Sequence, residues 1–243
     1  MTEYYRIPLG PAAAYLVKGQ NGYSLIDAGS KGKEQVFFDH LQRLGVCPEE
    51  LRLIVITHVH YDHVGGLAEI RETCQCPIVV HESEAELLKK AIISAPPSPT
   101  TSTGRLLSFI GRKLMPVERS FAPVKPDILI SKELLLDEYG LKGSILCTPG
   151  HTTGSISVLL LSGEAFVGDL ASSFPFQWAF PAYAEEPHEV LKSWRKILDF
   201  GAKTILPSHG KSFGAGRLAK EYEKRTLRLK TQKTNQQKLR RIS

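Results

Sequence analysis

The sequence predicts an α/β fold in which two β-sheets pack together and helices cover their outer faces. Short apolar runs such as "LRLIVIT" and "SISVLLLSG" have the length and the branched residues of strands. Segments with helical spacing of apolar residues alternate with them, and strands and helices occur in two similar halves of the chain. A layered sandwich buries the apolar face of every such element.

The first half contains a hairpin, two helices and two further strands. The segment "AAYLVKGQNGYSLIDAG" holds two apolar runs around Asn21-Gly22, which predicts a hairpin because both residue types tolerate positive φ. Apolar spacing in "EQVFFDHLQRLG" predicts a helix that ends at Gly45. "LRLIVIT" predicts a strand buried on both faces, and "CPIVVHESEAELLKKA" a strand followed by a helix.

Residues 92–126 differ from the rest because they contain six of the fifteen prolines and a cluster of Ser and Thr. Apolar spacing within residues 105–115 predicts one short amphipathic helix there. A segment too long for a simple connection is often a lid, so we expect an inserted lid over a site, with a disordered loop as the alternative.

The second half continues with strands in "DILI", "GSILCTPG", "SISVLLLSG", "AFVGD" and "AKTILPSHG". A helix is predicted from Pro187, which suits a first turn, to Phe200, and Gly201 follows as its end.

The charge of the chain is unevenly distributed. Residues 217–243 hold ten basic and two acidic residues, and removing this +8 from the net +6 leaves −2 for the rest. We therefore expect one domain over residues 1–216 and a basic C-terminal helix or tail over 217–243. A charge run of this kind is usually solvated, and its basic residues are not interleaved with aromatic ones, so nucleic-acid binding is not expected.

Targeting patterns, membrane spans and cysteine pairs bear on the compartment of the protein. The opening "MTEYYRIPLG" lacks the pattern of a secretory signal, and no apolar run approaches the ~20 residues of a membrane span. The four cysteines form no CxxC pair. We expect a cytoplasmic protein, monomeric or homodimeric, that acts on a small molecule and has no membrane partner.

Predicted strands repeatedly end in side chains that bind metals. The stretch "VITHVHYDHVGGL" places three histidines and an aspartate within six residues, and later strands end in "TPGH", "VGD" and "PSHG". Imidazole nitrogen and carboxylate oxygen suit Zn²⁺, with Fe and Mn as competitors. The candidate ligands are His58, His60, Asp62, His63, His151, Asp169 and His209.

The spacing of the first cluster favours two adjacent metals. His58 and His60 point the same way from an extended segment and suit one metal, whereas Asp62 and His63 lie where the next helix begins and suit a second. Gly65-Gly66 leaves room for close backbone approach at that point.

These motifs resemble a known family. In order along residues 12–213, "LIDAG", "THVHYDHVGG", "TPGHTTGS", "FVGD" and "LPSHG" resemble the five motifs of the metallo-β-lactamase-fold hydrolases. The resemblance implies a four-layer αββα sandwich with a dinuclear site at one edge of the paired sheets.

The resemblance also assigns roles to residues. It implies that one metal is bound by His58, His60 and His151, and a second by Asp62, His63 and His209. It implies that Asp169 bridges both metals and that Asp27 supports the ligands from behind. The full set resembles glyoxalase II and the acyl-homoserine lactonases, and it departs from true β-lactamases, which lack the bridging aspartate. Flavodiiron proteins carry Glu at the position of His60, so the chain does not resemble that branch of the family.

The expected reaction is hydrolysis of an ester, thioester or lactone by a hydroxide bridging two zinc ions. Asp62 would orient this hydroxide and carry a proton toward the leaving group. One alternative is a mononuclear-iron oxygenase resembling the persulfide dioxygenases, against which the complete second ligand set argues. Another is a nucleic-acid or phosphodiester-cleaving member of the same fold.

The stretch "LASSFPFQWAFPAY" after Asp169 carries aromatic residues at alternate positions, including Phe176, Trp178 and Phe180. We expect Phe176 and Trp178, together with Phe109 of the lid segment, to bind substrate in an apolar pocket. The alternative is that these rings anchor their loop in the core. The pocket reading predicts a preference for substrates with an apolar acyl part.

Overall fold

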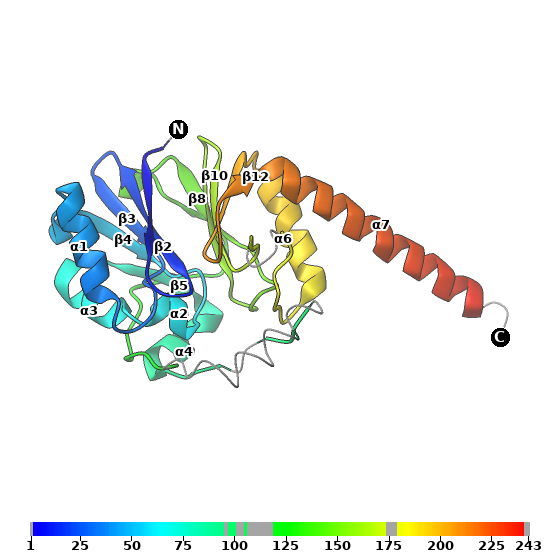
Figure 1. Ribbon diagram of the computed structural model, residues 1–243, viewed down its shortest axis with the longest axis horizontal. Helices are drawn as coiled ribbons and strands as arrows, with labels where there is room; N and C mark the ends of the chain where they lie inside the picture. Colours follow the sequence, from blue (N-terminus) through cyan, green and yellow to red (C-terminus); the bar gives the residue numbers. More distant parts are fainter. Residues whose placement is uncertain (1, 95–96, 101–104, 106–118, 174–178, 241–243) are drawn as a thin grey trace.

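The computed structural model describes residues 2–94, 97–100, 105, 119–173 and 179–240. Within these residues, twelve strands form two six-stranded sheets, ordered β1-β2-β3-β4-β5-β6 and β12-β11-β10-β9-β8-β7. The sheets face one another and helices lie on the outer side of each (Figure 1). The chain therefore has the four-layer α/β sandwich that the sequence predicts.

The first sheet begins as an antiparallel meander and continues as a parallel sheet. Strands β1 to β3 pair antiparallel, and β3 to β6 pair parallel. Its strands are β1 (Tyr4–Pro8), β2 (Ala13–Gly19), β3 (Gly22–Ile26), β4 (Leu51–Val55), β5 (Ile78–His81) and β6 (Ile128–Ile130).

The predicted hairpin forms, but its turn lies one residue earlier than expected. Gly19 pairs with Gly22, so Gln20 and Asn21 make the turn and Gly22 is the first residue of β3. A Cβ on Gly22 would lie 2.2 Å from the carbonyl oxygen of Glu50, and its φ is 134°. Glycine is required here by the close approach of the chain before β4, which the local turn pattern does not reveal.

The second sheet is antiparallel except for the parallel pair β10 and β11. Its strands are β7 (Leu134–Leu135), β8 (Gly143–Cys147), β9 (Ile156–Leu160), β10 (Glu164–Gly168), β11 (Thr204–Pro207) and β12 (Phe213–Gly214).

Helices α1, α4 and α6 lie where the sequence predicts them. The first ends at Gly45, whose φ of 69° forms the left-handed cap, and Pro187 opens the first turn of α6. The α-helices are α1 (Glu34–Leu44), α2 (Tyr61–Val64), α3 (Leu67–Cys74), α4 (Ala85–Lys90), α6 (Pro187–Asp199) and α7 (Ala215–Arg240), and the 3₁₀ turns are Pro48–Glu50, Glu82–Glu84 and Asp137–Tyr139.

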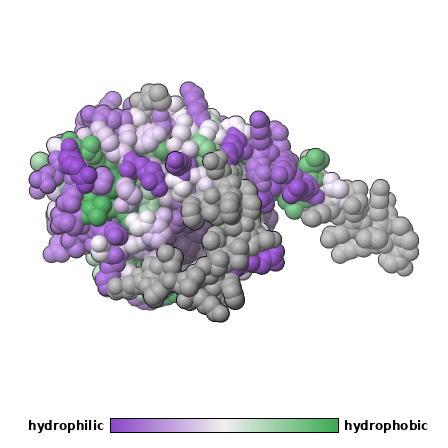
Figure 2. All heavy atoms as spheres, in the orientation of Figure 1, coloured by the Kyte–Doolittle hydropathy of each residue, from purple (hydrophilic) through white to green (hydrophobic). Residues whose placement is uncertain are grey.

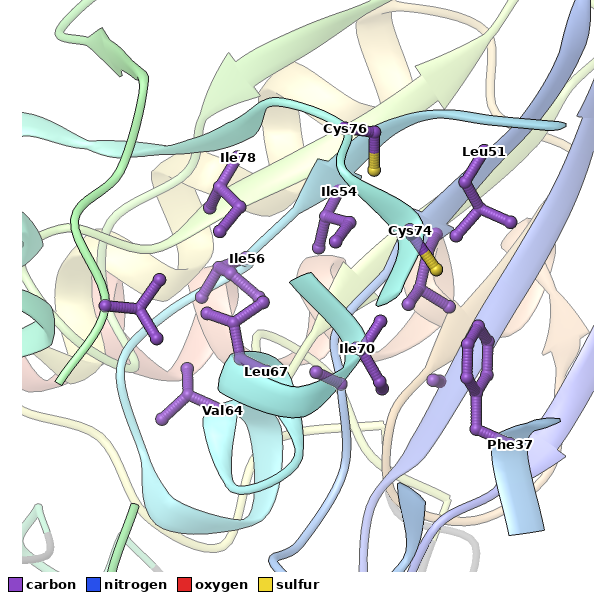
Figure 3. Close-up of a cluster of buried hydrophobic side chains, with 14 of the residues drawn as sticks. Phe37, Leu51, Ile54, Ile56, Val64, Leu67, Ile70, Cys74, Cys76 and Ile78 are labelled. Atoms are coloured by element: carbon purple, nitrogen blue, oxygen red, sulfur yellow. The ribbon is translucent and has the colours of Figure 1, made fainter. Parts of the chain in front are cut away.

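Alternating side chains on the strands separate three apolar layers. On β4, Ile54 packs toward the helices, whereas Leu53 and Val55 face the second sheet. Figure 3 shows the outer cluster, in which Phe37 of α1 and Ile70 of α3 lie with the strand residues. Successive side chains of β4 point to opposite faces of the sheet, and both faces are covered. A nearly continuous apolar run is therefore what this strand requires, as the sequence predicts.

The other two layers complete the sandwich. Between the sheets, the rings of Tyr15 and Phe166 meet edge to face with centroids 5.2 Å apart. Outside the second sheet, the fully buried Trp194 of α6 and Leu218 of α7 pack on residues such as Ile205 of β11. Three apolar interfaces between four layers account for the rigid frame that holds the strand ends.

Helix α7 starts on the body and extends away from it. Its first turns bury Leu218 against the second sheet, and the remainder projects past the sandwich (Figure 1). Figure 2 shows mainly hydrophilic residues on this face of the molecule, although Leu227 on α7 is 67% exposed. Among the described residues, no helix combines the length and apolar character needed to cross a membrane.

Just over half of the lid predicted at residues 92–126 lies outside the described residues, as does most of the short helix predicted at 105–115. The described part at Ser98–Thr100 runs beside residues 182–184. The backbone N–H of Thr100 donates to the carbonyl of Ala182 at 2.8 Å, and that of Ala184 to the carbonyl of Ser98 at 3.1 Å. The start of the insertion is therefore fixed to the segment that precedes α6.

Candidate metal centre

The candidate ligands gather because several strands end at the same edge of the sandwich. His58 and His60 follow β4, and His151 follows β8. Asp169 directly follows β10, and His209 follows its parallel neighbour β11. At this edge the backbone N–H of Ile156 donates to the carbonyl of Thr57 at 2.9 Å, which joins the two sheets.

Three imidazoles form the first group of ligand atoms. Nδ1 of His60 lies 2.9 Å from Nε2 of His58 and 3.2 Å from Nε2 of His151. All three ligand atoms fall within 4.8 Å of one another. The arrangement points three ring nitrogens into one small volume, as a tetrahedral metal with an open fourth position requires.

A second group lies beside the first. Asp62, His63 and His209 also offer ligand atoms within 4.8 Å of one another. Asp62 and His63 are buried on the short helix α2, and Oδ2 of Asp62 lies 3.4 Å from Nε2 of His209.

Asp169 lies between the two groups. Its Oδ1 is 3.4 Å from Nε2 of His63, and its Oδ2 is 3.2 Å from Nε2 of His209 and 3.6 Å from Nε2 of His151. One carboxylate therefore reaches histidines of both groups. The structure brings together all seven residues that the sequence singles out as ligands.

Asp27 holds the ligands from behind. It is buried with φ of 61°, and its carboxylate accepts hydrogen bonds from the backbone N–H and hydroxyl of Thr57 at 2.8 and 2.9 Å. Its Oδ2 also lies 2.8 Å from Nδ1 of His63 and accepts from the hydroxyl of Ser208 at 3.1 Å. Fixing Nδ1 in this way directs Nε2 of His63 toward Asp169.

The ring of His151 is likewise fixed through its Nδ1 atom. Its Nδ1 lies 3.0 Å from the carbonyl oxygen of Tyr183, which favours the tautomer with the lone pair on Nε2. The sequence motifs do not single out Tyr183, although it is the last residue of the aromatic stretch "LASSFPFQWAFPAY". A backbone carbonyl carries no residue-type signal, so no motif could have identified this contact.

Burial keeps the imidazoles of His58 and His60 neutral. It lowers the pKa of His60 to about 3, with His151 acting in the same direction, and holds the pKa of His58 well below its ordinary range. Neutral imidazoles present lone pairs, which is the form that binds a metal.

The second group has the opposite balance because carboxylates face it. Burial of His209 is outweighed by the charge of Asp169, and its pKa rises to about 10. Burial also opposes ionisation of Asp62, but its hydrogen bond to His209 and the charge of His63 bring its pKa to about 2. The carboxylates of this group stabilise the protonated forms of His63 and His209, and a bound metal would replace those protons as the positive charge.

Three polar atoms on residues of the cluster have unused bonding capacity. Nε2 of His60, Nε2 of His63 and Oδ1 of Asp169 are buried and make no well-formed hydrogen bond among the described residues, although the last two lie 3.4 Å apart. Buried polar atoms of this kind need a ligand to compensate for their desolvation. Converging lone pairs, uncompensated atoms and an all-nitrogen and oxygen donor set together fit a divalent cation such as zinc.

A pocket of about 200 Å³ opens onto the cluster. His151, Asp169 and His209 form its polar floor. Its described walls are Ser172, Pro181, Ala182 and Tyr183. A small molecule in this pocket would contact these ligand side chains.

Of the aromatic residues that the sequence singles out, the three expected to bind substrate are not described, and the neighbouring Phe180 is. Phe109, Phe176 and Trp178 lie outside the described residues, so their contacts remain predictions. Phe180 is described and is 5% exposed, with its ring 5.5 Å from that of Trp194. For Phe180 the structure shows the alternative that the sequence left open: the ring anchors its loop in the core by packing against Trp194 of α6.

Gly65 fits the close approach that the sequence predicts after the first cluster. A Cβ at this position would lie 2.1 Å from the backbone nitrogen of Lys31, which cannot move independently of its loop. We expect Gly65→Ala to lower the free energy of unfolding by about 1–3 kcal/mol or more, as overpacking does. Gly216→Ala is the control, because nothing lies within 4 Å of its added Cβ. Urea unfolding of both variants measures the effect, and equal stabilities would contradict the packing argument.

Comparison with known proteins agrees with this geometry. The model of the metallo-beta-lactamase superfamily matches residues 7–209. The uncharacterized protein YobT of Bacillus subtilis (strain 168) is 30% identical over 217 residues, which cover 84% of each chain. The probable metallo-hydrolase MJ0888 of Methanocaldococcus jannaschii is 34% identical over 155 residues, 62% of this chain and 65% of that protein.

Two further similarities concern function and fold. The acyl-coenzyme A thioesterase MBLAC2 of Gallus gallus is 26% identical over 238 residues, covering 85% of this chain and 75% of that one. Among solved structures, the BLEG-1 B3 metallo-beta-lactamase superposes with a TM-score of 0.65 at 22% identity, covering 88% of this chain and 95% of that one. The second likeness concerns the fold alone. On the family model and the relatives together, the chain belongs to the metallo-beta-lactamase superfamily.

Proposed function

We propose that the chain is a zinc-dependent hydrolase of an ester, thioester or lactone, of the dinuclear branch that contains glyoxalase II and the lactonases. The observation that carries the proposal is the position of Asp169. Its two carboxylate oxygens lie within 3.6 Å of histidine nitrogens from both ligand groups. Two neighbouring donor sets joined by one carboxylate suit two cations a few ångströms apart.

The proposed ligand sets follow the groups of the cluster. The first cation would be held by His58, His60 and His151, the second by Asp62, His63 and His209, and both by Asp169. When bound, two zinc ions lower the pKa of a water molecule and polarise a carbonyl oxygen, which supplies the nucleophile and stabilises the developing negative charge.

Asp62 is the proposed proton carrier. Its carboxylate is buried on α2, and Oδ2 lies 3.4 Å from Nε2 of His209 at the floor of the pocket. From there it can hold the attacking water by one oxygen and later pass the proton to the leaving group.

An acyl substrate with an apolar part suits the pocket walls. Pro181 and Ala182 are apolar and stand beside the hydroxyl-bearing Ser172 and Tyr183. The relative MBLAC2 carries the name of an acyl-coenzyme A thioesterase, which favours a thioester among the three acyl classes. We further propose that Phe109, Phe176 and Trp178 extend the apolar wall. Each buried methylene of the acyl chain should then add up to about 0.8 kcal/mol to transition-state binding.

Metal removal and a substrate panel test the proposal together. Metal content is first measured by elemental analysis on protein purified without added metal. The protein is then depleted with a chelator and assayed with thioester, lactone, β-lactam and bis-phosphodiester substrates before and after zinc is restored. We expect about two zinc per chain, activity on thioesters or lactones, loss of that activity on depletion and its recovery with zinc.

Different outcomes separate the alternatives. Full activity in verified metal-free protein rules out metal-dependent hydrolysis. About one iron per chain with no hydrolysis would indicate a mononuclear oxygenase, and phosphodiester cleavage alone would indicate a nuclease-like member of the superfamily.

A further inference from the structure

Glu84 is a buried carboxylate beside the ligand cluster that is a member of none of the ligand groups formed by the described residues. It closes the 3₁₀ turn Glu82–Glu84 between β5 and α4, and only 3% of it is exposed. Burying a carboxylate is costly unless its oxygens accept hydrogen bonds, so both oxygens of Glu84 need hydrogen-bond donors.

The two oxygens of Glu84 bind two different loops. Oε2 accepts a hydrogen bond from the backbone N–H of Val59 at 3.0 Å. Oε1 accepts one from the hydroxyl of Thr152 at 2.7 Å. Val59 lies between His58 and His60, and Thr152 directly follows His151. One carboxylate thus connects the loops that carry the three imidazoles of the first group.

The loop that carries His151 and Thr152 packs closely against the carboxylate side chain of Glu84. A Cβ on Gly154 would lie 2.4 Å from Cγ of Glu84, so any larger residue would push the loop and Glu84 apart. Ser155 accepts from the backbone N–H of Thr152 through its hydroxyl at 3.0 Å, which fixes the turn in which Thr152 stands. The contact with Glu84 is therefore built into the turn.

We propose that Glu84 is a positioning residue that sets the separation between the His58–His60 loop and His151. It would thereby control the affinity of the first metal, and this inference rests on the proposed function. The two loops come from different sheets, and a connection of fixed length keeps Nε2 of His151 near Nδ1 of His60. Supporting residues of this kind typically alter metal affinity by about 10–100-fold when changed.

Glu84→Asp is the decisive variant, because it keeps the charge and shortens the side chain by one methylene. The shorter carboxylate can reach only one of the two loops. We expect zinc affinity, measured by competition with a chromophoric chelator, to fall about 10–100-fold at one site. The cobalt-substituted protein should show an altered d–d absorption spectrum, and with saturating metal kcat should fall while KM changes little.

Glu84→Gln is the conservative variant that should rescue the site. Its amide oxygen can accept from Val59, and its amide nitrogen can donate to the hydroxyl of Thr152, so both loops remain connected. We expect zinc affinity and the cobalt spectrum close to those of the parent. Thr152→Val tests the same connection from the other loop and should weaken zinc binding, whereas Thr152→Ser should not.

Glu164 provides a matched control. It is 4% exposed and lies at the opposite end of β10 from Asp169, where it accepts a hydrogen bond from the hydroxyl of Ser162. Glu164→Asp should lower the melting temperature without changing zinc affinity or the cobalt spectrum. Melting temperatures of all variants separate a general loss of stability from a loss of positioning.

Three results would overturn the inference: parental zinc affinity in folded Glu84→Asp and Thr152→Val, equal losses in Glu164→Asp, or a parent protein that binds no zinc. Because affinity is measured without substrate, it is independent of the reaction. Absence of hydrolysis alone would count against the proposed function and leave the positioning role of Glu84 intact.

Discussion

Asp169→Ala is expected to release most of the bound metal and to abolish nearly all hydrolytic activity. Oδ1 of Asp169 faces His63, and Oδ2 faces His151 and His209, so the change removes a donor from both proposed sites at once. The loss should exceed the roughly 100-fold that changing a supporting contact costs, because a direct ligand is removed. Elemental analysis and kcat/KM at saturating zinc measure the two effects.

The fold should survive Asp169→Ala because the three apolar layers do not depend on this side chain. Circular dichroism and the melting temperature check this. Asp199→Ala is the control, since Asp199 is 56% exposed and pairs with Arg195 on the outer surface of α6. A variant that retains two metals and ordinary turnover would contradict the assignment of Asp169 to both sites.

Asp62→Asn is expected to lower kcat by about two to four orders of magnitude, the contribution typical of a general acid–base group. The amide matches the carboxylate in shape and can stay near His209, but it cannot take up or deliver the proton. Affinity for the second metal should also weaken, because a neutral oxygen replaces an anionic one. The rate must therefore be measured at saturating zinc with the metal content verified.

Asp62→Glu separates the two effects of Asp62→Asn. It restores a titratable carboxylate in a displaced position, so part of the rate should return even if metal affinity remains reduced. Unchanged rates in Asp62→Asn with both metals bound would leave Asp62 with no catalytic role.

Much of the fold follows from local patterns in the sequence. The apolar runs of β4 and β9 occupy buried strands, and Gly45 and Pro187 lie at the helix ends where their backbone preferences place them. Five short motifs at strand ends also identify the superfamily. Strands buried on both faces are apolar along their length, so their polar residues stand at the strand ends, where the motifs lie. The same motifs single out the seven residues that cluster in the structure.

Other features depend on contacts between distant segments. Gly22 is needed by the approach of Glu50, and Phe180 is buried because α6 lies against it, although its sequence spacing is also compatible with a pocket ring. Nothing in the local sequence pattern distinguishes Glu84 from other charged residues, yet its carboxylate connects loops from both sheets.

The sequence by itself thus determined most of the strands, three of the helices, the family and the candidate ligands, whereas the tertiary structure decided which of them meet and what holds them. Periodicity and turn chemistry act over a few residues, so they report which face of an element is buried. His60 and His151 are 91 residues apart, and their ring nitrogens come within 3.2 Å only because the two sheets pack face to face. That packing is a property of the whole core, which no single segment encodes.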